Sequence, residues 1–241
     1  MIPGVIASHN RAGKVLPSLN LVGIAQYNGW AASAGSINVD VAAQVPSVQN
    51  GDLLVLLASY GNSGGAVSGA PGTTPSGWAK DAYDGGGSSG AALGFYRRTY
   101  AGSPVSVATY TNVNHKGMIF VFRNFDTVTP TSGAASFTNF SASNPYGTVT
   151  LPSEKSSCLI TCRVLSNNAS SDMEIPQKPS NINDARTIYV PPSSSRQYVY
   201  PGVYYRMLTA AEGNGASFAP GQIGPTAQWS FVGEILVRGA S

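Results

Sequence analysis

The sequence predicts an all-β protein, and three observations lead to that fold class. Glycine (28 residues) and proline (16 residues) recur throughout the 241-residue chain, so few stretches are long enough for a stable helix. Hydrophobic residues make up 42% of the chain, which supplies a packed core and argues against a disordered chain. They occur in short runs or alternate with polar residues, which is the pattern of strands joined by turns.

The first segment, residues 1–20, is predicted to be an extended arm, because it lacks a sustained hydrophobic period and contains Pro3 and Pro17. Termini of this composition become ordered only when something holds them, so we expect the arm to contact the domain or a neighbouring subunit. The residues assigned to this assembly contact are Ile2, Pro3, Val5, Ile6, Val15 and Leu16.

Strands are predicted from residue 21 onwards. Apolar and polar residues alternate in "NLVGIAQY" and "SINVDVAAQV", which indicates half-buried strands, whereas "GDLLVLLASY" is apolar throughout and predicts a strand covered on both faces. A Pro-Gly turn leads into Trp78, a predicted core anchor. Further strands are predicted in "AALGFYRRTYA", "VSVATYT" and "KGMIFVFRNFD", and the last of these places Met118, Phe120 and Phe122 on one face.

The pattern of the first half recurs in the second half. "GFYRRTY" from Gly94 resembles "GVYYRML" from Gly202, "SSCLITCRVLS" resembles "GDLLVLLASY", and "QWSFVGEILVRG" resembles "HKGMIFVFRN". One half alone would leave a sheet face in water, whereas two halves bury these faces against each other. We therefore predict one antiparallel, jelly-roll-like β-sandwich domain over residues 21–241, with a pseudo-twofold internal repeat of about 21–126 and 127–241.

Charged residues are scarce, at 10% of the chain, and give a net charge of +3 without any run of like charges, so we expect no nucleic-acid partner. Arg97 and Arg206 follow the repeated aromatic pairs, and we expect each to stack on a tyrosine or cover a sheet face rather than bind a ligand. No apolar stretch approaches the ~18 residues of a membrane span, so no membrane insertion is expected. The N-terminus lacks the pattern of a secretion signal, which predicts synthesis in a cytoplasm without export.

Three candidate reactive sites are present, and we interpret none of them as catalytic. The string "GNSGG" around Ser63 resembles the nucleophile loop of trypsin-like serine proteases. Those enzymes place their catalytic histidine and aspartate before the serine, whereas here His9, in the predicted arm, is the only histidine that precedes Ser63. His9 and His115 are the only histidines, too few for an imidazole metal site. Asp81 and Asp84, in a predicted glycine-rich loop, are candidates for calcium binding or acid–base work, although a solvated pair is far commoner.

Two further stretches are predicted to be structural. Cys158 and Cys162 on one strand would lie ~13 Å apart, too far for a disulfide, so we expect buried thiols. The "DGGGSSG" stretch offers backbone amides to an anion, but no Lys-Ser/Thr pair and no helix follow it. The sequence therefore predicts a non-enzymatic protein without catalytic residues, cofactor or metal ion.

Surface loops rich in tyrosine, serine, glycine and asparagine are the remaining candidates for function. Such loops make adaptable contacts with proteins or glycans, and they also suit packing between subunits, so both interpretations stay open. The residues assigned to surface recognition are Tyr189, Tyr198, Tyr200, Asn112 and Asn114.

Four motifs together resemble a jelly-roll-type module of tailed-bacteriophage virion proteins. That module has a strand beginning GDLL, a P-x-GW turn, a YYR or YYK strand and an aromatic strand closing on RGVD. The matching positions are Gly51-Asp52-Leu53-Leu54, Pro75-Ser76-Gly77-Trp78, Phe95-Tyr96-Arg97 and Arg123-Asn124-Phe125-Asp126, with departures at Asn124 and Phe125. The resemblance covers about residues 20–240.

This resemblance implies a virion building block in the tail, the baseplate or the capsid surface. Its partners would be copies of itself and other virion proteins, and it transfers no catalytic residue. The alternative is a carbohydrate-binding adhesin module that contacts host surface glycans, and a hydrolase is a remote third reading.

Overall fold

The fold is all-β, as predicted, with antiparallel strands and two single-turn helices in the part of the chain that the structure describes. The computed structural model describes residues 18–31, 35–61, 74, 76–85, 91–109, 113–126, 135–140, 149–150, 155–166, 184–187, 199–213, 217–218 and 229–240. The first-half elements are β1 (Asn20–Ala31), β2 (Gly35–Val39), α1 (Val41–Gln44), β3 (Leu53–Gly61), β4 (Ala79–Gly85), β5 (Ala91–Thr99), β6 (Val105–Thr109) and β7 (Val113–Arg123). The second-half elements are β8 (Ala135–Phe140), β9 (Val149–Thr150), β10 (Ser157–Ser166), β11 (Asp184–Thr187), β12 (Val199–Leu208), α2 (Ala210–Gly213), β13 (Ser217–Phe218) and β14 (Trp229–Arg238).

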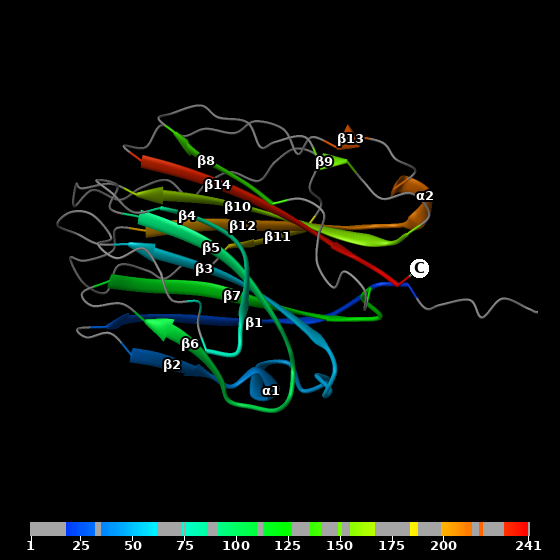
Figure 1. Ribbon diagram of the computed structural model, residues 1–241, viewed down its shortest axis with the longest axis horizontal. Helices are drawn as coiled ribbons and strands as arrows, with labels where there is room; N and C mark the ends of the chain where they lie inside the picture. The colour runs from blue at the N-terminus through cyan, green and yellow to red at the C-terminus, as the bar shows by residue number, and fades with distance from the viewer. Residues whose placement is uncertain are drawn as a thin grey trace, which may run out of the picture.

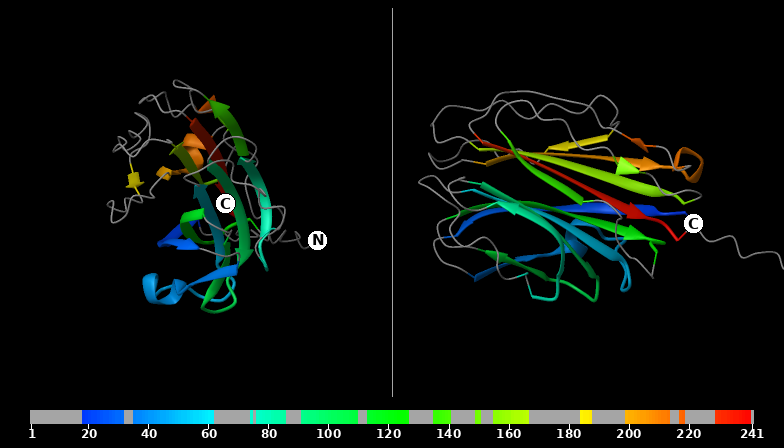
Figure 2. Two further views of the ribbon diagram at one scale, coloured as in Figure 1. Left: turned by 90° about the vertical axis from the view of Figure 1, so that its left-hand side faces the viewer. Right: turned by 45° about the horizontal axis from the view of Figure 1, so that its top comes forward.

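The strands form two five-stranded sheets and two two-stranded sheets. The first large sheet has the order β1-β7-β3-β5-β4, and the second has the order β11-β12-β10-β14-β8. The small sheets are β2-β6 and β9-β13. In Figure 1 the strands of the second large sheet overlap β4 and β5 of the first, while β3, β7 and β1 lie below them. β2 and β6 lie near the bottom of that view, and β9 and β13 lie near the top. In the right-hand view of Figure 2 the second large sheet lies mostly above the first.

One hydrophobic core, which we call the central core, contains residues of both large sheets. Met118, Phe120 and Phe122 of β7 all contribute to it, which confirms the face predicted for this strand. Phe120 also meets the ring of Tyr205 edge-on, with ring centroids 5.7 Å apart. The second half supplies Cys158, Ile160, Cys162, Val203, Ile235 and Val237 to the same core. Residues from both halves are therefore buried together.

A second core lies on the outer face of the first sheet. Leu54, Leu56 and Tyr60 of β3 point into it, so β3 is buried on both faces, as its continuous apolar run predicted. The cover comes from β2, α1 with the residue after it, and β6, through Val39, Val41, Val45, Val105 and Val107. Trp78 is buried in this core, which confirms the predicted anchor.

The strand predicted in "SINVDVAAQV" is only half correct, because β2 ends at Val39 and α1 follows. The carboxylate of Asp40 accepts a hydrogen bond from the backbone N–H of Ala43 (3.0 Å) and so caps the helix. The second helix is capped in a reciprocal way: Thr209 Oγ1 accepts from Glu212 N (3.3 Å), and Glu212 Oε2 accepts from Thr209 N (2.9 Å).

The two halves are joined where β7 and β14 end, a region that we call the junction end (residues 18–19, 124–126, 155–156 and 238–240). The Asp126 N–H donates to the carbonyl of Arg238 (3.1 Å), and the Ala240 N–H donates to the carbonyl of Asn124 (2.8 Å). Lys155 Nζ also forms an ion pair with Asp126 at 2.8 Å.

The chain enters the domain at this junction end, and the predicted boundary of the arm needs a correction. Leu19 is buried in the central core, and its N–H donates to Ser156 Oγ at 2.7 Å. Because Asn20 already begins β1, residues 18–20 belong to the domain and not to an arm. The assigned arm residues Ile2 to Leu16 lie outside the described residues.

The opposite end of the molecule, which we call the far end, is where β3 and β10 stop and where β7, β12 and β14 begin. The strand registers pair Gly61 with Asn114, and Ser166 with both Val199 and Trp229. In Figure 1 these strand ends lie away from the C mark.

Candidate functional site

The first and last of the four resemblance motifs meet in a bidentate ion pair. Arg123 donates from Nε to Asp52 Oδ1 and from Nη2 to Asp52 Oδ2, both at 2.8 Å. The buried Asp52 also accepts from the N–H of Gln49 (2.9 Å), while Arg123 Nη2 donates to the carbonyl of Ser47 (2.9 Å). The hydrogen bond to Asp52 raises the pKa of the Arg123 guanidinium. This pair fastens the start of β3 to the end of β7, which is a structural role.

The P-x-GW motif is a packed turn. Trp78 Nε1 donates to the carbonyl of Ser106 at 2.9 Å, and the guanidinium carbon of Arg98 lies 5.6 Å from the Trp78 ring centroid. Gly77 has φ +78°, and a Cβ there would come within 3.2 Å of Arg98 Nη1. The positive φ therefore favours glycine at this position.

Arg97 forms an ion pair that was not predicted from the sequence. Its Nε lies 3.4 Å from Asp81 Oδ1, and the Asp81 side chain is 9% exposed. Asp81 and Asp84 were predicted in a loop, but both belong to β4, where the register shifts between Lys80 and Ala82. Asp81 is the extra residue of this β-bulge, and its carboxylate pairs with Arg97.

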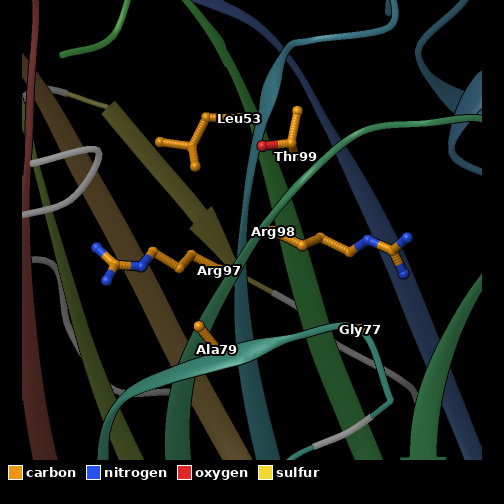
Figure 3. A pocket seen from close by; sticks show the side chains of 6 residues that line it. All are labelled: Leu53, Gly77, Ala79, Arg97, Arg98 and Thr99. Carbon is orange, nitrogen blue, oxygen red and sulfur yellow. The ribbon is translucent and has the colours of Figure 1, made fainter. Parts of the chain in front are cut away.

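A shallow hollow of about 240 Å³ lies beside these arginines. Its lining is Leu53, Gly77, Ala79, Arg97, Arg98 and Thr99. Figure 3 shows that the Arg97 and Arg98 side chains leave β5 in opposite directions. Successive residues of a strand point to opposite faces, so the two guanidiniums do not converge on one ligand.

Arg206 likewise forms an ion pair. Its Nη2 donates to Glu212 Oε1 at 2.7 Å. The pKa of Glu212 is lowered, first by the backbone hydrogen bond from Thr209 and then by the Thr209 and Arg206 side chains. Tyr204 is buried, and Tyr205 packs on the central core. Residues 199–206 form most of β12.

His115 and Lys116 are buried at the far end of β7. The His115 ring meets Tyr60 edge-on, with centroids 5.5 Å apart. Lys116 is 5% exposed, its carbonyl accepts from Ser59 Oγ (2.9 Å), and burial lowers the pKa of its ammonium to about 8. Ser63, the candidate nucleophile, lies outside the described residues, as does His9.

Cys158 and Cys162 are free and buried in the central core, which confirms the prediction of unpaired thiols. Burial raises the pKa of the Cys162 thiol well above its ordinary value. A thiol that resists deprotonation is a poor nucleophile and a poor metal ligand.

The residues assigned to surface recognition are only partly described. Tyr189, Tyr198 and Asn112 lie outside the described residues. Tyr200 lies on β12 and Asn114 on β7, and both backbone positions are at the far end. The two recognition residues within the described ranges therefore fall at the same end of the molecule.

Neither a metal cluster nor a membrane-spanning helix is found within the described ranges. No group of three or more histidine, cysteine, aspartate or glutamate residues converges there. No helix in this part of the chain has the length and apolar character needed to cross a bilayer. No family model matches the sequence, and searches among curated proteins and among solved structures find no match.

Sequence reasoning missed the pairing of the charged residues. In a chain with so few charges, a buried aspartate needs a cationic partner, so Asp52 at the start of a fully buried strand was a signal. The partner, Arg123, is 71 positions away and is identified only by the β3–β7 register.

Proposed function

We propose that the chain is a β-sandwich produced by internal duplication, in which each half is a rolled-up hairpin. In the first half β1 pairs with β7 and β3 with β5, while β2 pairs with β6 and β4 is the tip. In the second half β8 pairs with β14 and β10 with β12, while β9 pairs with β13 and β11 is the tip. This nesting is typical of jelly rolls. The pseudo-twofold repeat is supported by this identical order and by the shared core.

We further propose that the protein is a non-enzymatic structural component of a bacteriophage virion, on the tail, the baseplate or the capsid surface. The single observation that carries this proposal is the network that the resemblance motifs form. Asp52 and Arg123 join the first and last motifs, and Trp78 of the second motif contacts Arg98, so among the described residues these motif side chains serve packing and pairing. A module whose signature residues serve only its architecture suits a building block. It would be made in the host cytoplasm, with copies of itself and other virion proteins as partners.

The place where the chain enters supports assembly through the N-terminal segment. Leu19 is fastened to both halves at the junction end, so a partner that holds residues 1–17 would hold the whole domain. An extended segment that adds to a neighbour's sheet edge supplies affinity and direction through backbone hydrogen bonds.

The test is a truncation that removes residues 1–17 and keeps Leu19. We expect this variant to fold with an unchanged thermal midpoint and to be missing from assembled particles. The control is Leu19→Ala in the full chain, which should lower the midpoint without removing the arm. Incorporation of the truncated chain at the level of the full chain would contradict the role of the arm.

A second candidate function is glycan binding by a carbohydrate-binding adhesin module. It is favoured by the position of Asn114 and Tyr200, which share the end opposite the chain entry. An anchored module would present that end outwards. Glycan-array binding of the purified protein should decrease in Tyr200→Ala and Asn114→Ala, and absence of binding to any host surface polysaccharide would count against this function.

A further inference from the structure

We propose that Ser157 and Arg238 form a binding site for a carboxylate on the outer face of the second sheet. The inference goes beyond a structural role. It starts from a comparison of equivalent positions in the two halves and rests on buried polar atoms of the second half.

The strand registers make the two positions equivalent. In the first sheet Leu53 pairs with Phe122, which places Asp52 opposite Arg123 one residue further along. In the second sheet Ser157 pairs directly with Arg238. Both pairs stand at the junction end of the corresponding strands, β3 with β7 and β10 with β14.

The side chains lie on the same face in both halves. Leu53 and Phe122 point into the central core, as do Cys158 and Val237, so their neighbours in sequence point outwards. In the first half an aspartate fills the outward position, and the arginine holds its carboxylate with two hydrogen bonds. In the second half the outward position holds a serine, which is too short to offer the arginine a carboxylate.

The second-half groups lack acceptors among the described residues. Ser157 is fully buried, and its Oγ has no hydrogen-bond partner. Arg238 Nε is also buried without a partner, although the residue as a whole is partly exposed. An arginine whose inner N–H has lost water, next to a buried hydroxyl, is a strong donor set for an anion.

The geometry selects a planar, bidentate oxyanion. The guanidinium presents parallel N–H groups that match the two oxygens of a carboxylate, as the Asp52–Arg123 pair demonstrates in the same fold. The exposed side of Arg238 gives the approach, and Ser157 Oγ supplies the inner donor. The carboxylate can come from a free small acid or from an acidic side chain of a second copy of this chain.

The experiment measures thermal unfolding of the full chain in sodium acetate and in sodium chloride of equal ionic strength. We expect acetate to raise the midpoint of the wild type relative to chloride. Ser157→Asp supplies a built-in carboxylate, so it should raise the midpoint by about 3 °C in chloride and abolish the acetate effect. No acetate effect in the wild type, or an equal effect in Arg238→Gln, would overturn the proposal.

A second variant keeps the proposal testable if Ser157→Asp does not fold. Asp52→Ser copies the second-half arrangement into the first half, so acetate should restore part of the midpoint that this variant loses. No restoration would count against a serine–arginine pair as a carboxylate site.

Sedimentation distinguishes the two sources of the carboxylate. Self-association of the wild type that acetate and Ser157→Asp both abolish would assign the carboxylate to a second copy. A monomer throughout, with the acetate shift present, would assign it to a free acid. Self-association that neither changes, with no acetate shift, would overturn the proposal.

Discussion

The two halves of the molecule use the same order of strands but fasten them differently. At the junction end of β3 and β7 in the first half, Arg123 binds the buried carboxylate of Asp52. At the junction end of β10 and β14 in the second half, Ser157 lies opposite Arg238. The second half nevertheless pairs β10 with β14 over its full length. The comparison teaches that the nested pairing and the shared core specify the architecture, while the motif residues strengthen one half.

The largest expected effect comes from breaking the ion pair of the first half. Asp52→Ala leaves Arg123 without its carboxylate partner and leaves the Gln49 N–H without its acceptor. The free energy of unfolding should therefore decrease by about 3 kcal/mol. The measurement is urea denaturation. The control is Ser157→Ala, where no hydrogen bond is lost and the change should stay within about 0.5 kcal/mol. Equal decreases in the free energy of unfolding for Asp52→Ala and Ser157→Ala would contradict the proposed difference between the two halves.

Lys116 gives a second contrast between the two halves. When Phe122 of β7 is aligned with Val237 of β14, the position equivalent to Lys116 is Phe231. Burial lowers the Lys116 pKa from 10.5 to about 8, so the unfolded chain binds more protons between these values and stability rises with pH across that window. Below about pH 8 the folded state bears the full free-energy cost of burying the charged Lys116 ammonium, which is on the order of 3 kcal/mol at most.

Lys116→Met should therefore stabilise the protein at pH 7 and flatten the rise between pH 8 and pH 10.5. Denaturation curves at several pH values measure both effects. The exposed Lys80→Met is the control and should leave that slope in place. If stability still rises between pH 8 and pH 10.5 in Lys116→Met, this pH dependence comes from another titratable group.

The junction between the halves gives a smaller effect. A Cβ at Gly239 would lie 2.5 Å from Ser156 Oγ, 2.9 Å from the Ser156 carbonyl oxygen and 3.0 Å from Leu19 Cβ. Gly239→Ala should cost about 2 kcal/mol and increase proteolysis at the entry to β1. In Gly29→Ala the nearest atom is the flexible Ile37 Cδ1 at 3.3 Å, so this control should lose less than half as much.

The smallest effect sharpens the comparison of the two helices. Thr209→Ala removes one side of the capping box of α2 and should cost about 1 kcal/mol in urea denaturation. Asp40→Ala removes the cap of α1 and should cost a similar amount. A much larger loss for Asp40→Ala would show that α1, as cover of the outer core, supports more of the fold than its cap alone.

Much of the fold could be predicted because periodicity reports burial directly. The two-sided burial of β3 and the apolar face of β7 were readable from alternation and from continuous apolar runs. The helices were missed because each has only four residues, too few for a helical period, although Asp40 and the Thr-x-x-Glu pattern at Thr209 were available signals.

The candidate site was less predictable because it depends on partners far apart in the chain. The arginines were expected to stack on a tyrosine or cover a sheet face, and their acidic partners were not predicted: Arg97 pairs with an aspartate from a β-bulge, and Arg206 pairs with a helix cap. A bulge changes which residue faces which, and no local pattern reveals it. The recognition residues Tyr189, Tyr198 and Asn112 stay predictions.

The attachment of Leu19 at the junction end also determines how the domain would carry a pulling force. A pull between the segment before Ser18 and the far end runs along the strands, and β1 lies antiparallel to β7 from Asn20 to Ala31. Its ladder of hydrogen bonds would then be loaded in shear, so many must break together instead of opening one by one.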